Sequence, residues 1–145
     1  MKRNKNLRKL SSDHHSALSL ARKIDKATKD NQDHYDFTHQ VIEIFNNDLL
    51  PHFTIEEQAI LPELKKIGQR ELVSKTLEDH AQLKSLANNL VQPGNLRKFG
   101  KLLKDHVRFE EKILFEACQN LLDDAALNSI GYLSCCNPSQ PENGN

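Results

Sequence analysis

HFTIEEQAILPEL, from His52 to Leu64, is the stretch of sequence from which the fold and the chemistry of this chain can both be approached. It contains a His-x-x-x-Glu pair, His52 and Glu56, set among apolar residues at helical spacing. Residues four apart lie on one face of an α-helix, about 6 Å from each other along the axis. The stretch therefore predicts a helix that points an imidazole and a carboxylate into the same space.

The same pattern occurs a second time in HVRFEEKILFEAC, which contains His106 and Glu110. Two such pairs that face each other across a helical bundle can supply the ligands of a site with two metal ions. The second copy therefore predicts that the two helices pack with their His and Glu side chains facing each other.

Apolar residues recur with a period of 3.5 to 3.6 along nearly all of the chain, which predicts an all-α fold. Short polar connections at 29–33 and 92–94 favour an up-down-up-down antiparallel four-helix bundle. We expect Pro51 to distort the second helix locally and Asn95 to cap the fourth. The four predicted helices run from about Asn4 or Asn6 to Lys29, from His34 to Leu64, from Arg70 to Val91 and from Leu96 to Leu122.

We expect residues 1–122 to form this bundle as one domain and residues 123–145 to form a short helix and a flexible tail. The short helix is expected from Asp123 to about Leu133, with Asp123 or Asp124 as its cap. The last nine residues, NPSQPENGN, have the composition of a disordered tail.

Each predicted helix has one narrow inward seam, and each seam carries residues that can bind a metal. Counted at 1.5 Å per residue, the candidates on all four helices lie about 12–16 Å from the same end of the bundle. The seam of the fourth helix, for example, is expected to continue past Glu110 through Ile113 and Ala117. The six candidates are His14, His52, Glu56, His80, His106 and Glu110.

Burial of four imidazoles and two carboxylates without a cation would leave many polar atoms in need of partners. A metal site therefore explains the pattern better than a buried polar network, although a structural bundle without metal remains the alternative. Zinc rarely takes six protein ligands, and calcium and magnesium prefer oxygen. Mixed imidazole and carboxylate ligands suit iron or manganese, and two shared carboxylates suggest a dinuclear centre.

Other titratable residues near the motifs are not expected to bind metal. His15, His34 and His39 lie off the seam or at a different depth. Glu57 and Glu111 point about 100° away from the neighbouring candidate carboxylates, so we expect them to support the site from outside or to lie on the surface. We assign no catalytic residue.

Composition limits the function further. Lys and Arg number 20, as do Asp and Glu, so the net charge is about zero, which argues against a nucleic-acid or membrane partner. The basic start lacks the apolar run of a signal peptide, and three cysteines without a secretory signal fit a cytoplasmic protein with reduced thiols. Adjacent Cys135 and Cys136 suggest an accessory redox or metal site only as a minor alternative.

The motifs DHHSAL, LLPHFTIEEQAILP, EDHAQL and LKDHVRFEEKILF give residues 7–120 a close resemblance to the hemerythrin family, in particular to bacterial hemerythrin-like HHE cation-binding proteins. The resemblance implies a four-helix bundle with a non-haem di-iron centre bridged by an oxo or hydroxo group. It implies His14 and His52 on one iron, His80 and His106 on the other, and Glu56 and Glu110 as bridges. Manganese is the less favoured metal.

The chain departs from the family pattern at Lys84, where oxygen-carrying hemerythrins have a further histidine. This position argues against pure reversible oxygen carriage and for a small ligand such as dioxygen, nitric oxide or peroxide in sensing, storage or detoxification. An iron or redox sensor, or an iron-handling module that signals through an unknown protein partner without turnover, is the alternative. We expect Lys84 itself to point into solvent.

Overall fold

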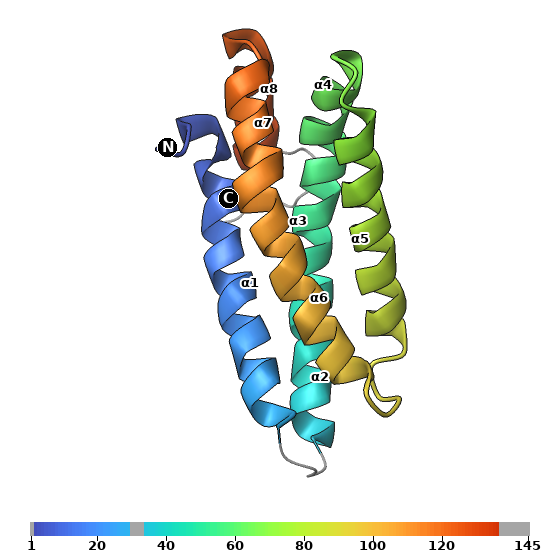
Figure 1. Cartoon of the computed structure of the whole chain (residues 1–145). Helices are drawn as coiled ribbons and strands as arrows, with labels where there is room; N and C mark the ends of the chain where they lie inside the picture. Colours follow the sequence, from blue (N-terminus) through green and yellow to red (C-terminus); the bar gives the residue numbers. More distant parts are fainter. Residues whose placement is uncertain (1, 30–33, 137–145) are drawn as a thin grey trace.

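The computed structural model describes residues 2–29 and 34–136, which form a bundle of four long helical rods and one shorter helix (Figure 1). The described residues contain no β-strand, so the prediction of an all-α fold is confirmed. Neighbouring rods run antiparallel, as Figure 1 shows.

The first rod consists of the 3₁₀ turn η1 (Lys5–Leu7) and α1 (Arg8–Ala27), and the third is α5 (Arg70–Asn88). The second and fourth rods are each divided by π-helical turns into segments that follow one another without a break. The second comprises α2 (Tyr35–Ile44), η2 (Phe45–Leu49), α3 (Leu50–Ile55), η3 (Glu56–Ile60) and α4 (Leu61–Lys66). The fourth comprises α6 (Asn95–Phe109), η4 (Glu110–Leu114) and α7 (Phe115–Leu121), and the shorter helix is α8 (Asp124–Cys136).

The helix ends differ from the predicted ones by a few residues. Asn95 is not the cap of α6, because Gly94 precedes the helix in a left-handed conformation and the Asn95 side chain donates to the Asn89 carbonyl at 2.8 Å. Asp123 accepts the Ala126 amide at 2.8 Å and so caps α8, as expected. The predicted tail, 137–145, lies outside the described residues.

Three π turns interrupt the long rods, and two of them begin at Glu56 and Glu110. In each turn a backbone amide donates to the carbonyl five residues earlier, for example from Leu61 to Glu56 and from Phe115 to Glu110. A π turn inserts one residue into the helical register, so every later side chain is rotated by about 100°.

This rotation overturns the predicted seam beyond Glu110. Ile113 is 51% exposed, whereas Leu114, Phe115 and Cys118 are buried in its place. Ala117 is only partly buried. The extra residue of η4 is the physical reason, because it moves the apolar face forward by one position.

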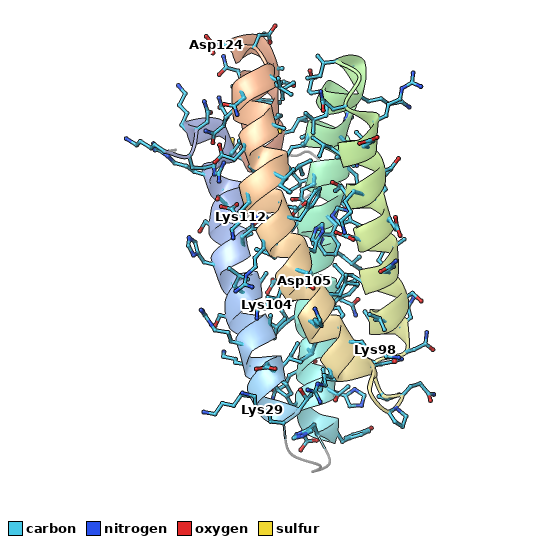
Figure 2. The ribbon with its side chains drawn as sticks, in the orientation of Figure 1. Lys29, Lys98, Lys104, Asp105, Lys112 and Asp124 are labelled. Atoms are coloured by element: carbon cyan, nitrogen blue, oxygen red, sulfur yellow. The ribbon has the colours of Figure 1, made fainter. Side chains whose placement is uncertain are left out.

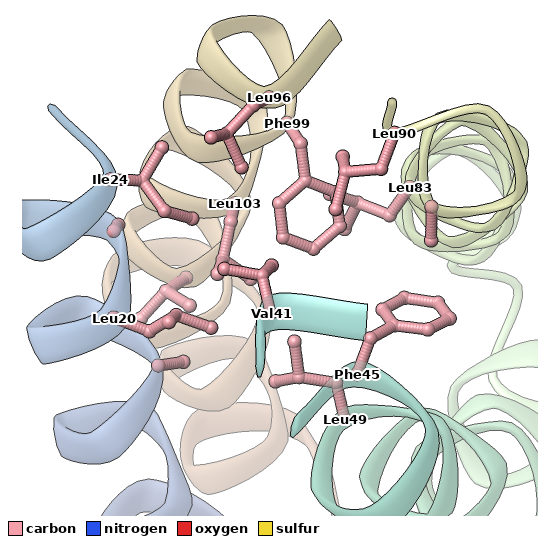
Figure 3. Packing of buried hydrophobic residues seen from close by; sticks show 14 of the residues in the cluster. Leu20, Ile24, Val41, Phe45, Leu49, Leu83, Leu90, Leu96, Phe99 and Leu103 are labelled. Atoms are coloured by element: carbon pink, nitrogen blue, oxygen red, sulfur yellow. The ribbon is translucent and has the colours of Figure 1, made fainter. Parts of the chain in front are cut away.

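Two apolar clusters lie on either side of a polar layer in the middle of the bundle. The first joins side chains from all four rods, including Leu20, Phe45, Leu83 and Phe99 (Figure 3). The second contains Leu7, Leu10, Leu64, Leu114, Phe115, Leu127 and Ile130. Between the clusters every rod places metal-competent side chains, so apolar packing above and below fixes the height of the site.

Helix α8 packs against the start of the chain. Leu127 and Ile130 share the second cluster with Leu7, and Asn6 donates to Asn128 at 3.1 Å. Figure 2 shows charged side chains on the outside of the bundle, among them Lys29, Lys98 and Asp124, all of which are exposed. Among the described residues, no helix is both long enough and apolar enough to cross a lipid bilayer.

Candidate metal centre

The six residues predicted from the sequence meet at one level of the bundle, and all of them are buried. Each rod contributes at least one of them, because residues four apart share one helical face and both members of each His-x-x-x-Glu pair therefore turn inward together. His14 comes from α1, His52 and Glu56 from α3 and the start of η3, His80 from α5, and His106 and Glu110 from α6 and the start of η4.

These residues form two sets of four that share both carboxylates. In the first set, His14 Nε2 lies 2.9 Å from Glu110 Oε1, and His52 Nε2 lies 3.1 Å from Glu56 Oε2. In the second, His80 Nε2 lies 3.1 Å from Glu56 Oε1, and His106 Nε2 lies 3.3 Å from Glu110 Oε2. Each carboxylate therefore presents one oxygen to each pair of imidazoles, which is the arrangement of a bridging ligand.

Four further carboxylates hold the outward nitrogens of the same imidazoles. A carboxylate can only accept, so each Nδ1 must carry the proton, and the Nε2 of a neutral ring is then a bare lone pair directed into the bundle. The four pairs are Asp13 to His52 at 3.0 Å, Glu57 to His80 at 2.7 Å, Asp79 to His106 at 2.9 Å and Glu111 to His14 at 2.7 Å.

The centre of the bundle thus collects lone pairs and negative charge without enough donors. Glu56 Oε2, His106 Nε2 and Glu110 Oε2 are buried and have no hydrogen-bond partner. Buried polar atoms without partners are costly, so cations or protons must occupy the space between these groups. Four imidazole nitrogens and two carboxylates gathered in this way fit a metal site.

In the absence of metal, protons take that role. Burial alone would favour the neutral ring, but the Glu110 and Glu111 carboxylates raise the pKa of His14 well above its usual range. Against the same effect of burial, Glu56 and Asp13 raise the pKa of His52 to about 9. Burial opposes ionisation of Glu56 as well, yet the imidazoles of His52 and His14 hold its pKa well below normal. Metal ions would therefore enter by displacing protons.

Aromatic rings cover part of the site. Phe53 stacks on His80 with ring centroids 4.1 Å apart, and Phe115 stacks on His14 at 5.1 Å. These contacts fix the planes of two imidazoles and keep water from their faces.

A cavity of about 370 Å³ lies between α1 and the second rod and reaches the site. Its walls include the apolar side chains of Ala17, Leu20, Leu103 and Val107, while exposed Asn47 and Asp48 lie toward its opening. His14, His52, His106 and Glu110 line its inner end. The cavity offers a small molecule a route to the imidazoles.

The residues expected to lie outside the site do so. His15 and His39 are exposed, and the ring of His39 packs against Tyr35. The Lys84 side chain is 45% exposed and does not lie fully in solvent as expected, because its Nζ is 3.8 Å from Glu57 Oε2. Lys84 thus places a cation on the carboxylate behind His80.

Asp13 and Asp79 were not among the residues predicted from the sequence. A signal was present, because both directly precede a site histidine, just as Glu57 and Glu111 directly follow a site glutamate. The signal is ambiguous, since Asp105 also precedes a site histidine but pairs with Lys101 at 2.9 Å on the surface. Adjacency alone does not say which acid turns inward.

Comparison with known proteins gives one family. The family model described as the hemerythrin HHE cation binding domain matches residues 5–118, which include all six central residues and the four carboxylates behind them. No curated protein and no solved structure matches the chain.

Proposed function

This chain belongs to the hemerythrin HHE cation-binding family, and on that premise we propose that it is a non-haem di-iron protein that binds or reacts with a small ligand. Dioxygen, nitric oxide and peroxide are the ligands we consider, in a role in sensing, storage or detoxification. His14 and His52 would hold one ion, His80 and His106 the other, and Glu56 and Glu110 would bridge the two.

The observation that carries this proposal is the sharing of both carboxylates between the two sets of imidazoles. His14 and His52 place their Nε2 atoms 3.2 Å apart. Two nitrogens at right angles on one ion, each at about 2.1 Å, would be separated by about 3 Å. The mixture of imidazole and carboxylate favours iron, with manganese second.

The two sets of ligands are alike, since each has two imidazoles and the same two carboxylates. Lys84 supports this equality, because it stands where oxygen carriers of the family have a further histidine and instead pairs with Glu57. Two equally liganded ions favour ligand reaction or sensing over simple reversible oxygen carriage.

The cavity supports a small ligand. A volume of about 370 Å³ accommodates a diatomic molecule or peroxide, and its apolar walls suit uncharged molecules. Bound iron would supply a redox-active binding position at the inner end. The protein supplies orientation, because Asp13 and Glu111 fix the rings that face the cavity through their Nδ1 atoms.

Elemental analysis and an optical spectrum of protein purified from iron-replete cells test the proposal. We expect about two iron ions per chain and a near-ultraviolet absorption that azide or peroxide perturbs. A chain that contains no iron or manganese, and whose thermal unfolding is unchanged by a chelator, would instead be the structural bundle without metal.

A sensor that signals through a partner without turnover is the second candidate. One contact favours it: Arg3, near the start of the chain, binds the Glu111 carbonyl at 3.0 Å, and the Glu111 carboxylate holds His14. A change at the site could thereby reach the surface. This candidate predicts a change of shape or oligomeric state on oxidation, with negligible turnover of peroxide.

A further inference from the structure

The four carboxylates behind the imidazoles, which we name the outer carboxylates (Asp13, Glu57, Asp79 and Glu111), each form an ion pair with a cation, and one of these cations, Arg3, also pairs with Glu116 at 3.8 Å. Two of these cations come from the preceding turn of the same helix, and two come from a different rod. The pairs are Lys9 Nζ with Asp13 at 2.8 Å, Lys75 Nζ with Asp79 at 2.8 Å, Arg3 Nη2 with Glu111 at 3.4 Å and Lys84 Nζ with Glu57 at 3.8 Å.

We propose that Arg3, Lys9, Lys75 and Lys84 are positioning residues that tune the metal centre from outside, by limiting how strongly the outer carboxylates draw on the imidazole protons. The inference rests on the proposed function only in taking a metal as the occupant of the site. It concerns residues that lie outside the ligand set.

The physical effect has a definite sign. A carboxylate that accepts the Nδ1 proton of an imidazole makes Nε2 a stronger electron donor, and so favours a more highly charged metal ion. A cation paired with the carboxylate weakens its hold on the Nδ1 proton, so Nε2 becomes a weaker electron donor. Because a cation lies beside each outer carboxylate and offsets part of its charge, the negative charge that faces the metals comes mainly from Glu56 and Glu110.

Stability does not explain the Lys9 and Lys75 pairs well, since ion pairs with an exposed partner contribute little to folding. Lys9 and Lys75 have side chains that are 59% and 51% exposed. Two of the cations also touch an aromatic ring that contacts the same imidazole. Arg3 lies 5.5 Å from the Phe115 ring, which stacks on His14, and Lys75 lies 5.5 Å from the Phe109 ring, which is 6.4 Å from His106.

Lys75 offers the cleanest test because the chain contains a matched control. Lys75, Asp79 and His80 have the same spacing as Lys101, Asp105 and His106, and both lysines form a pair of similar length with the aspartate four residues on. Asp79 binds a site imidazole, whereas Asp105 is a half-exposed surface residue. Lys75→Gln and Lys101→Gln therefore remove the same surface ion pair with and without a link to the site.

The first measurement uses metal-free protein and follows the Nδ1 proton of His106 by NMR. We expect Lys75→Gln to move this resonance downfield, because Asp79 becomes the stronger acceptor, and Lys75→Arg to restore it. Lys101→Gln should leave it in place. Equal spectra for Lys75→Gln and Lys101→Gln would overturn the proposal, whether or not the protein binds iron.

The second measurement uses the iron-loaded protein. Lys75→Gln should lower the reduction potential and slow the loss of metal to a chelator severalfold. Asp79→Asn should act in the opposite direction and weaken metal binding by about 10–100-fold. Shifts of the same sign in both variants would overturn the proposal, because a merely structural role predicts similar damage from either change. If native protein takes up no metal at all, the proposed function fails, and the NMR comparison still decides whether Lys75 acts on the His106 proton through Asp79.

Discussion

His14 and His52 direct their Nε2 atoms at each other across 3.2 Å, although the Nδ1 of each ring binds a carboxylate. Two neutral imidazoles held in this way face each other with lone pairs, which is a repulsive arrangement. The same apposition becomes favourable when a cation lies between them. The contact therefore ties the packing of α1 against α3 to the occupancy of the site.

Removal of Glu110, a proposed bridging carboxylate, should abolish binding of the proposed metal pair. In Glu110→Ala, each set of ligands loses one of its four members, so we expect the metal content to fall from about two ions per chain to one or none. Elemental analysis after gel filtration measures this. His15→Ala is the control, since His15 is exposed beside His14 and should leave the metal content unchanged. Equal metal content in both variants would reject the assignment of Glu110.

Metal-free protein should lose stability as the pH rises above neutrality. The pKa of His52 is raised to about 9 and that of His106 to about 10, each despite burial and because of nearby carboxylates. A histidine whose pKa is raised on folding stabilises the protein fully below its pKa in the unfolded chain, about 6.5. This stabilisation is lost as the pH rises through the pKa in the folded protein. We therefore expect the free energy of unfolding of metal-free protein, measured with urea, to fall progressively between about pH 6.5 and pH 10.

Acid should destabilise the same protein for the opposite reason. Burial disfavours the charged forms of Asp13 and Glu111, yet the imidazoles of His52 and His14 lower the pKa of these carboxyls. A carboxyl whose pKa is lowered on folding stabilises the protein above its unfolded pKa of about 4, and this stabilisation is lost as the pH falls.

Bound metal should flatten the decline in stability at alkaline pH, because it replaces the protons on the imidazoles. A metal-free protein of constant stability from pH 6 to pH 10 would contradict this account.

Helical periodicity could locate the six central residues because no π turn lies between the two members of either His-x-x-x-Glu pair, and because His14 and His80 lie on helices without a π turn. His52 and Glu56 are joined by the regular helix α3, and His106 and Glu110 by α6. Beyond Glu110 the same reasoning failed, since η4 rotates the rest of the rod and exposes Ile113. No proline follows Glu110 within η4 or α7, so the sequence carries no local sign of this turn.

The outer carboxylates could not be assigned from the sequence for a different reason. Asp79 and Asp105 each precede a site histidine and follow a lysine by four positions. Asp79 is buried and binds His106 on the neighbouring rod, while Asp105 faces solvent. The difference lies in which side of each helix meets a neighbour, and that depends on the tertiary arrangement.

Gly100→Ala should destabilise the bundle where α1 and α6 approach closely. A Cβ atom at Gly100 would lie 2.6 Å from Ile24 Cγ2 and 3.1 Å from Ile24 Cβ, so the two helices would have to move apart. We expect a loss of about 1–3 kcal/mol, typical of overpacking, in the free energy of unfolding by urea. Lys104→Ala on the exposed side of the same helix is the control and should change little. If Gly100→Ala leaves the free energy of unfolding unchanged, the Ile24 side chain or the two helices must make room for the added methyl group at little cost.

Narrowing the cavity between α1 and the second rod should slow ligand access without loss of metal. Ala17 is buried and lines the cavity, so Ala17→Leu places extra methyl groups in the route to His14 and His52. If these groups raise the barrier to passage by about 1.4 kcal/mol, the association of azide with the iron-loaded protein slows about tenfold. Stopped-flow absorbance measures this rate, and metal analysis verifies that both ions remain. Ala81→Leu makes the same change on the exposed face of α5 and should leave the rate unaltered. A fully loaded Ala17→Leu protein that binds azide as fast as Ala81→Leu would show that small molecules reach the centre from another side of the bundle.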